Sequence, residues 1–250
     1  MKIPRIAVAA LAVVAVLAGG AYTVDAVSAS RVEAEISARI APEMPGAAPP
    51  SVMTGGPFTR WSEPGTLSSV SIRAERVARP GVAPVAVEAE ATDLVTTDLG
   101  DTDLEDTGLS AQSVVVSVQM IGDSLAQALD MRDVLIEAAD DHSLAGGTEH
   151  RARVTGTVLE SGERVSAIVD LVVDPSGAHL VPVAAATGPG GVPDQDPELA
   201  LRATALTFAP DLLPLGVPVE SLTIKGGTLT ASGTGGPGTP PLDGLLRDDH

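Results

Sequence analysis

The residues best suited to bind a metal ion form an acidic run from Asp98 to Asp106. Carboxylates at alternate positions begin the calcium-binding loop of an EF-hand, which then requires glycine at its sixth position and a bidentate glutamate at its twelfth. When the loop is counted from Asp101, Asp106 takes the glycine position and Gln112 takes the glutamate position. The sequence therefore predicts a solvated acidic loop here, and no metal site.

Histidine is the side chain that most often moves protons in catalysis near neutral pH. The chain has 4 histidines, namely His142, His150, His179 and His250. His142 and His150 each directly follow an acidic residue, but no Gly-x-Ser-x-Gly, His-Glu-x-x-His or Walker pattern accompanies them. We therefore predict surface histidines on turns and no enzyme. The alternative is a hydrolase that uses His142 or His150.

The charge of the chain excludes one class of partner. The formal net charge is -18, from 33 acidic and 15 basic residues. Binding to nucleic acid requires clustered Lys and Arg against the phosphates, so we predict no nucleic-acid partner. The chain also has no cysteine, which excludes a thiolate nucleophile and cysteine-ligated metals. Nothing in the sequence indicates a cofactor.

The core must be built from small aliphatic side chains. Hydrophobic residues make up 44% of the chain, yet it has only 2 Phe, 1 Trp and 1 Tyr. Aromatic side chains normally supply much of the volume of a core. The interior is therefore either packed from many small residues or leaves space for a guest molecule. A genome that favours Ala, Gly, Pro and Val codons explains the same composition.

The first 22 residues are typical of an export signal. Lys2 and Arg5 precede an uncharged run from Ile6 to Tyr22. The small residues from Ala18 to Ala21 suit a signal peptidase, while the length of the run is also close to the ~17–25 residues that span a bilayer. The segment 1–22 is thus either a cleaved signal peptide or a membrane anchor. In both cases we predict that the rest of the chain is exported to the cell envelope or periplasmic space.

Two helices are predicted. The segment from Asp25 to Ile40 has no Gly or Pro, and its apolar residues recur at helical spacing. A longer helix is predicted from Ser124 to His142, because Ser124 and Gln127 fit a capping box and apolar residues recur as far as Ala139.

Strands make up most of the remaining chain. Apolar and polar residues alternate in 70–75, 85–89, 114–120, 152–158, 165–174 and 222–225. Alternation of this kind indicates an antiparallel sheet with one dry and one wet face. Residues 233–250 are rich in Gly, Pro, Thr and Asp, which predicts a flexible tail. The fold class is therefore α+β, and both a curved sheet wrapped around a long helix and a flat two-layer sandwich satisfy the pattern.

Two segments punctuated by Gly and Pro bracket these strands. The first is Gly55-Gly56-Pro57-Phe58 followed by Gly65–Ile72, and the second is Leu213–Pro218 followed by Glu220–Ile224 and a Gly226-Gly227 turn. Together they resemble the LmeA-like family of actinobacterial cell-envelope proteins, which bind phospholipid, and the resemblance covers Val24 to Gly233. It implies one lipid-binding domain, residues 24–232. It also implies a tubular lipid-binding (BPI-like) fold, in which a curved antiparallel sheet wraps around a long helix.

The resemblance places lipid contacts on the dry face of this sheet. The expected contacts are Phe58, Val70, Ile72, Val116, Val118, Val154, Val169, Leu171, Leu222 and Ile224. The same residues suit an ordinary core equally well. The implied partner is a phospholipid or another acyl lipid at the outer face of the cytoplasmic membrane, with a role in envelope lipid or lipoglycan (mannan) maintenance beside an envelope glycosyltransferase. The alternative is a ligand-free structural or partner-binding module of the envelope.

Details of the two segments lead to further expectations. Phe58 and Trp61 lie either at a pocket mouth or membrane interface, or plug the base of a sheet. Leu213–Gly216 is expected to form a corner before the last strand pair, with Gly216 available for a positive φ. Because the chain is acidic, it repels anionic headgroups, so any affinity for lipid must come from burial of acyl chains.

Overall fold

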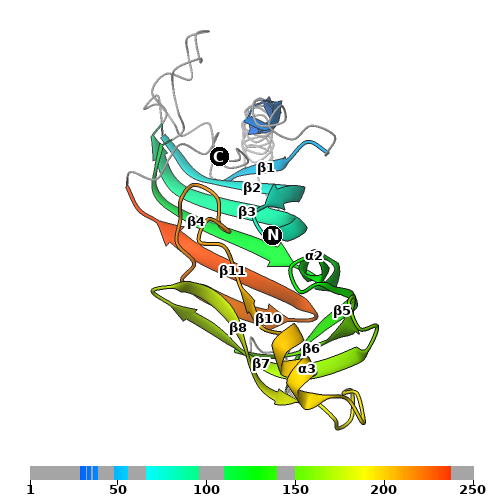
Figure 1. Cartoon of the computed structure of the whole chain (residues 1–250). Helices are drawn as coiled ribbons and strands as arrows, with labels where there is room; N and C mark the ends of the chain where they lie inside the picture. Colours follow the sequence, from blue (N-terminus) through cyan, green and yellow to red (C-terminus); the bar gives the residue numbers. More distant parts are fainter. Residues whose placement is uncertain are drawn as a thin grey trace, which may run out of the picture.

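Two antiparallel sheets form the body of the protein, and their buried side chains belong to one hydrophobic core (Figure 1). The computed structural model describes residues 29–31, 33–34, 36–38, 48–55, 66–95, 110–139 and 150–237. The first sheet has six strands in the order β1-β2-β3-β4-β11-β10, with bounds Ser51–Gly55, Thr66–Arg79, Val82–Val95, Ser110–Met120, Thr228–Gly235 and Ser221–Lys225. The second has five strands in the order β5-β6-β7-β8-β9, with bounds Met131–Ala138, Arg151–Val158, Arg164–Asp174, Gly177–Ala185 and Leu206–Thr207.

The predicted curved antiparallel sheet is confirmed, and all six predicted strand segments lie in strands. The long strands β2 and β3 curl (Figure 1), and β2 carries a bulge between Ala74 and Val77, where Arg76 has φ 59. A bulge increases the local twist of a strand, which favours a curled sheet over a flat one. The structure also contains strands that the alternation did not reveal, namely β1, β5, β8, β9 and β11.

The long helix predicted from Ser124 to His142 is wrong. The chain forms only the short helix α2 (Gly122–Ala126) and then strand β5. A bulge in β5, where Asp133 has φ 52, adds one residue between the buried side chains of Met131 and Val134. Buried residues at 131, 134 and 136 therefore imitate helical spacing within a strand. The described residues hold no long helix, so the expectation of a sheet wrapped around one is not met in this part of the chain.

The helix predicted from Asp25 to Ile40 is confirmed where the structure describes it, because all its described residues between 29 and 38 are helical. The side chain of Ile36 is buried in the core, and the Ser37 hydroxyl donates to the Pro50 carbonyl at 2.8 Å. The backbone N–H and the hydroxyl of Thr54 in β1 both donate to Glu33 Oε1 at 2.9 Å. This helix therefore protects the edge strand of the first sheet from pairing with other chains.

The remaining elements join the two sheets or cover them. Helix α2 connects β4 to β5 and packs on β3, whereas helix α3 (Pro197–Ala203) packs on β7 and β8. Strand β10 contacts β5, β6 and β7, which joins the two sheets. Strand β11 extends to Gly235, so the first residues of the predicted 233–250 tail belong to the sheet. The predicted signal or anchor at 1–22 lies outside the described residues, and no described helix is long and apolar enough to cross a bilayer.

Candidate functional site

Most of the predicted lipid-contact residues lie on the dry face of the first sheet. Strand register places Ile72, Ala89 and Val116 side by side on this face, and every second residue along each strand joins them. Six predicted contacts lie here, each at most 2% exposed: Val70, Ile72, Val116, Val118, Leu222 and Ile224. These six side chains thus form one continuous aliphatic face on the sheet.

The other predicted contacts lie on the second sheet. Val154 and Val169 are fully buried, and Leu171 is 7% exposed. Leu171 also lines an open cavity of about 450 Å³ together with His150, Arg151 and Asp170. Two of these lining residues are bonded to each other, because the Arg151 guanidinium donates to Asp170 Oδ1 at 2.7 Å. The nine described residues of the predicted set are therefore buried, but the structure places them on two sheets and not on one, and their contact with lipid stays a prediction.

An irregular segment, residues 208–219, covers the dry face of the first sheet, and we call it the strap. Its buried apolar side chains are Phe208, Leu212, Leu213, Leu215 and Val217. In Figure 1 the strap, in orange, crosses the ribbons of β11 and β4. At one end Arg79 of β2 fixes it, because the guanidinium donates to the carbonyls of Leu212 at 3.0 Å and Asp211 at 2.6 Å.

The strap lies close against the sheet at Gly233 of β11. A Cβ atom at Gly233 would lie 2.0 Å from the Pro218 carbonyl oxygen and 3.1 Å from Leu213 Cδ1. Only glycine permits this contact, because it has no Cβ. Gly216 has φ 63, as the sequence predicted, and Leu215 has φ 61, a conformation that costs a non-glycine residue about 1–2 kcal/mol. The strap is therefore tightly seated and slightly strained.

The sequence predicted the corner in the strap but missed its covering role. Six large apolar residues within twelve positions, interrupted by three prolines and a glycine, were the available signal. Such a segment cannot form a helix or a central strand, yet its apolar residues need burial. A pattern of this kind is typical of irregular chain that packs its side chains against another element.

A family model supplies the decisive comparison. The model described as LmeA-like phospholipid-binding matches residues 23–234 of the chain. The chain belongs to this family. The matched range includes both sheets and the strap, so the LmeA-like domain coincides with the fold described above. Comparisons with curated proteins and with solved structures gave no match.

Several predicted features of this LmeA-like chain lie outside the described residues: Phe58, Trp61, the acidic run from Asp98 to Asp106, His142 and His250. Among the residues that the structure describes, no group of three or more His, Cys, Asp or Glu side chains is arranged to hold a metal ion. His150 is described and exposed, and it lines the cavity beside Leu171.

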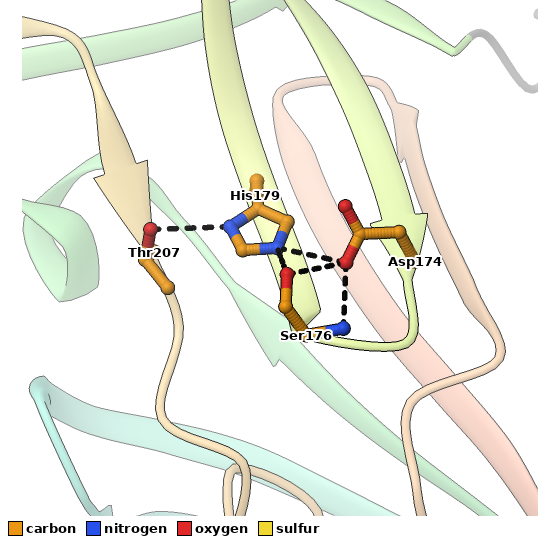
Figure 2. Close-up of polar contacts among 4 residues, drawn as sticks. All are labelled: Asp174, Ser176, His179 and Thr207. Atoms are coloured by element: carbon orange, nitrogen blue, oxygen red, sulfur yellow. Dashed lines mark hydrogen bonds and ion pairs between the residues drawn. The ribbon is translucent and has the colours of Figure 1, made fainter.

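His179 has a polar environment that the sequence did not indicate. Its Nδ1 lies 3.1 Å from the Thr207 hydroxyl, and its Nε2 lies 3.1 Å from the Ser176 hydroxyl and 3.4 Å from Asp174 Oδ1 (Figure 2). The hydroxyl and the backbone N–H of Ser176 both donate to Asp174 Oδ1, at 2.5 Å and 2.7 Å. These bonds hold the turn between β7 and β8 and connect it to β9. The arrangement serves to fix a turn, because the serine proton is directed to the carboxylate and not to the imidazole.

The Asp174 turn should weaken in acid. The hydrogen bond from the Ser176 hydroxyl, with help from the Ser176 backbone N–H and the charge of His179, lowers the pKa of Asp174 below its usual 3.8. A carboxylate whose pKa is lower in the folded state stabilises that state above its unfolded pKa, and the effect is lost as pH falls through the folded value. The Ser176 amide should therefore lose protection against hydrogen exchange, measured relative to its intrinsic exchange rate at each pH, below a pH of about 4. Asp174→Asn should remove this acid dependence, whereas Asp194→Asn should leave it intact; an unchanged profile in Asp174→Asn would contradict the assignment.

Proposed function

We propose that this chain binds a phospholipid, with an acyl chain lying on the dry face of the first sheet in place of the strap's side chains. The observation that carries the proposal is the nature of the cover over this face. An irregular strap lies on part of it, beside the contacts that α2 and the second sheet make with the first sheet. Within the strap the Leu212 N–H donates to the Ala209 carbonyl and the Val217 N–H donates to the Pro214 carbonyl, both in local turns, while at its start the Phe208 N–H donates to the Ala178 carbonyl of β8. Membership of a phospholipid-binding family supports the same conclusion.

The dry face has a similar free energy whether the strap or an acyl chain covers it. Exposing the five large apolar side chains of the strap would cost about 10 kcal/mol, at about 2 kcal/mol each. Burying roughly 14 methylenes of an acyl chain at about 0.8 kcal/mol each would return about 11 kcal/mol. Near-balance of this kind allows loading and release with a small net change in free energy. The net charge of -18 leaves acyl burial as the main source of affinity.

We propose a place of action from the sequence alone. The charged start and apolar run of residues 1–22 support export to the cell envelope or periplasmic space, with the chain either released there or anchored at the outer face of the cytoplasmic membrane. There the protein would bind phospholipid or another acyl lipid in support of envelope lipid or lipoglycan (mannan) maintenance. An envelope glycosyltransferase is the partner we propose for this role, on the strength of the family resemblance alone.

Native mass spectrometry of the full exported chain tests the proposal. We expect a phospholipid mass to accompany the purified protein, and the delipidated protein to take up phospholipid again from vesicles. A chain that is free of lipid after purification and takes up none from vesicles would overturn the proposal. That outcome would favour the ligand-free structural module, for which the filled dry face is the supporting observation.

A further inference from the structure

A second cavity lies where the two sheets meet. Its volume is about 480 Å³, within the range of roughly 300–1,000 Å³ that small-molecule sites occupy. Its lining consists of the β5 edge from Leu135 to Ala139, Arg153 of β6, and the Gly226-Gly227 turn between β10 and β11. The cavity is open to solvent and lies beside β5, an edge strand of the second sheet whose one ladder neighbour is β6.

Two opposite charges face this cavity without a close contact between them. Arg153 Nη1 lies 4.0 Å from Glu137 Oε2, so the pair is not closed by a short hydrogen bond. Arg153 Nε is buried and has no hydrogen-bond partner among the described residues. A Cβ atom at Gly190 would lie 2.4 Å from Arg153 Nη1, so the chain at Gly190 packs closely against the guanidinium. A buried donor without a partner costs about 1–3 kcal/mol, which a ligand oxygen would recover if the guanidinium turns Nε toward the cavity.

The turn at the floor of the cavity adds backbone donors. Gly226 and Gly227 have φ 54 and φ 80, and the strand pairing ends at Lys225 and Thr228. In a two-residue turn of this type the two central N–H groups lie outside the ladder. The cavity therefore offers a cation, a carboxylate and backbone donors within a small volume.

We propose that this cavity binds a phosphate ester that carries a primary ammonium group, as in an ethanolamine headgroup. Arg153 would take the phosphate, and Glu137 would accept hydrogen bonds from the ammonium group. An anion alone would meet the charge of Glu137 and the net charge of -18, whereas a zwitterion satisfies both side chains. This inference rests on the proposed function where it takes the headgroup to be that of a bound phospholipid.

The position of the cavity suits a headgroup of a lipid whose acyl chain lies on the first sheet. The β10–β11 hairpin carries Leu222 and Ile224 on the dry face and ends at Gly226-Gly227 in the cavity. Leu135 at the rim is 48% exposed, which offers an apolar contact to the glycerol end of a lipid. One hairpin thus connects the two parts of the site.

Competition between headgroups tests the inference. The full chain is incubated with phosphatidylcholine vesicles that contain equal amounts of phosphatidylethanolamine and phosphatidylglycerol, and native mass spectrometry measures the bound lipids. We expect phosphatidylethanolamine to be preferred by about tenfold over each of the others, the effect of about one charged hydrogen bond. E137Q should remove this preference and raise the share of phosphatidylglycerol, and R153M should reduce all headgroup preferences.

Controls separate the outcomes. D170N removes the same charge beside the other cavity and should keep the wild-type ranking, while the exposed position of Glu137 allows E137Q to fold even if R153M does not. An unchanged ranking in E137Q, with lipid uptake intact, would overturn the inference and leave the proposed function standing. Deacylated glycerophosphoethanolamine tests the cavity separately from acyl binding, because it has the headgroup and no acyl chain. If it binds wild type more tightly than E137Q while no vesicle lipid is taken up, the cavity assignment stands and the proposed function falls.

Discussion

Gly233→Ala should lower the free energy of unfolding of the lipid-free protein by about 1–3 kcal/mol and raise its apparent affinity for phospholipid by roughly 5- to 150-fold. The new Cβ atom would lie 2.0 Å from the Pro218 carbonyl oxygen, so the strap must move away from the sheet. If a lipid binds only when the strap has left the dry face, every kcal/mol removed from the closed state is gained in apparent affinity. Denaturant unfolding and a vesicle-uptake titration measure the two effects.

Gly122→Ala is the matched control for this variant. A Cβ atom at Gly122 would lie 1.9 Å from the Val134 carbonyl oxygen, a clash of the same kind that does not involve the strap. We expect a similar loss of stability and no gain in affinity. Lipid affinity in Gly233→Ala that equals or falls below that of wild type would show that the strap stays in place when lipid binds, and the lipid site would then have to be sought elsewhere.

The sheet could be predicted from the sequence because its strands are buried on one face. In β4, Val114, Val116, Val118 and Met120 are at most 1% exposed, and the residues between them are partly or fully exposed. Such alternation is a local property of the chain. Strand β5 escaped prediction because its bulge at Asp133 breaks the alternation, and only its pairing with β6 shows that it is a strand.

The site could be predicted only in part, for a similar reason. Buried positions such as Ile72 and Val118 follow from alternation, but which element covers them depends on contacts distant in sequence. Arg79 and Leu212 meet across 133 positions, and no local pattern announces this contact. Arg153 and Glu137 are both charged residues at outward positions of their strands, so the sequence gives no sign that they line one cavity with the Gly226-Gly227 turn.

Leu213→Ala should lower the stability of the lipid-free protein and increase the rise in Tm that lipid causes. The substitution leaves a void under the strap without moving the strap. Leu213 is 1% exposed, and its Cδ1 lies beside Gly233 over the dry face. Replacing a buried leucine by alanine costs about 2–5 kcal/mol, which combines lost burial with the cavity left behind. Because the strap's side chains leave this face when an acyl chain takes their place, the variant loses the Leu213 contact only in the lipid-free state. Bound phospholipid should therefore raise the Tm of this variant more than it raises that of wild type.

Leu180→Ala separates this effect from a general response to destabilisation. Leu180 of β8 is 2% exposed and belongs to the second sheet, so the variant should lose similar stability while lipid raises its Tm only as much as in wild type. An equal lipid response in both variants would argue that the acyl chain does not take the place of the strap on the dry face. A larger response in Leu180→Ala would place it instead against Leu171, the neighbour of Leu180 in β7. The pair of variants thus decides whether the acyl chain lies on the first or on the second sheet, since the predicted lipid contacts include residues of both.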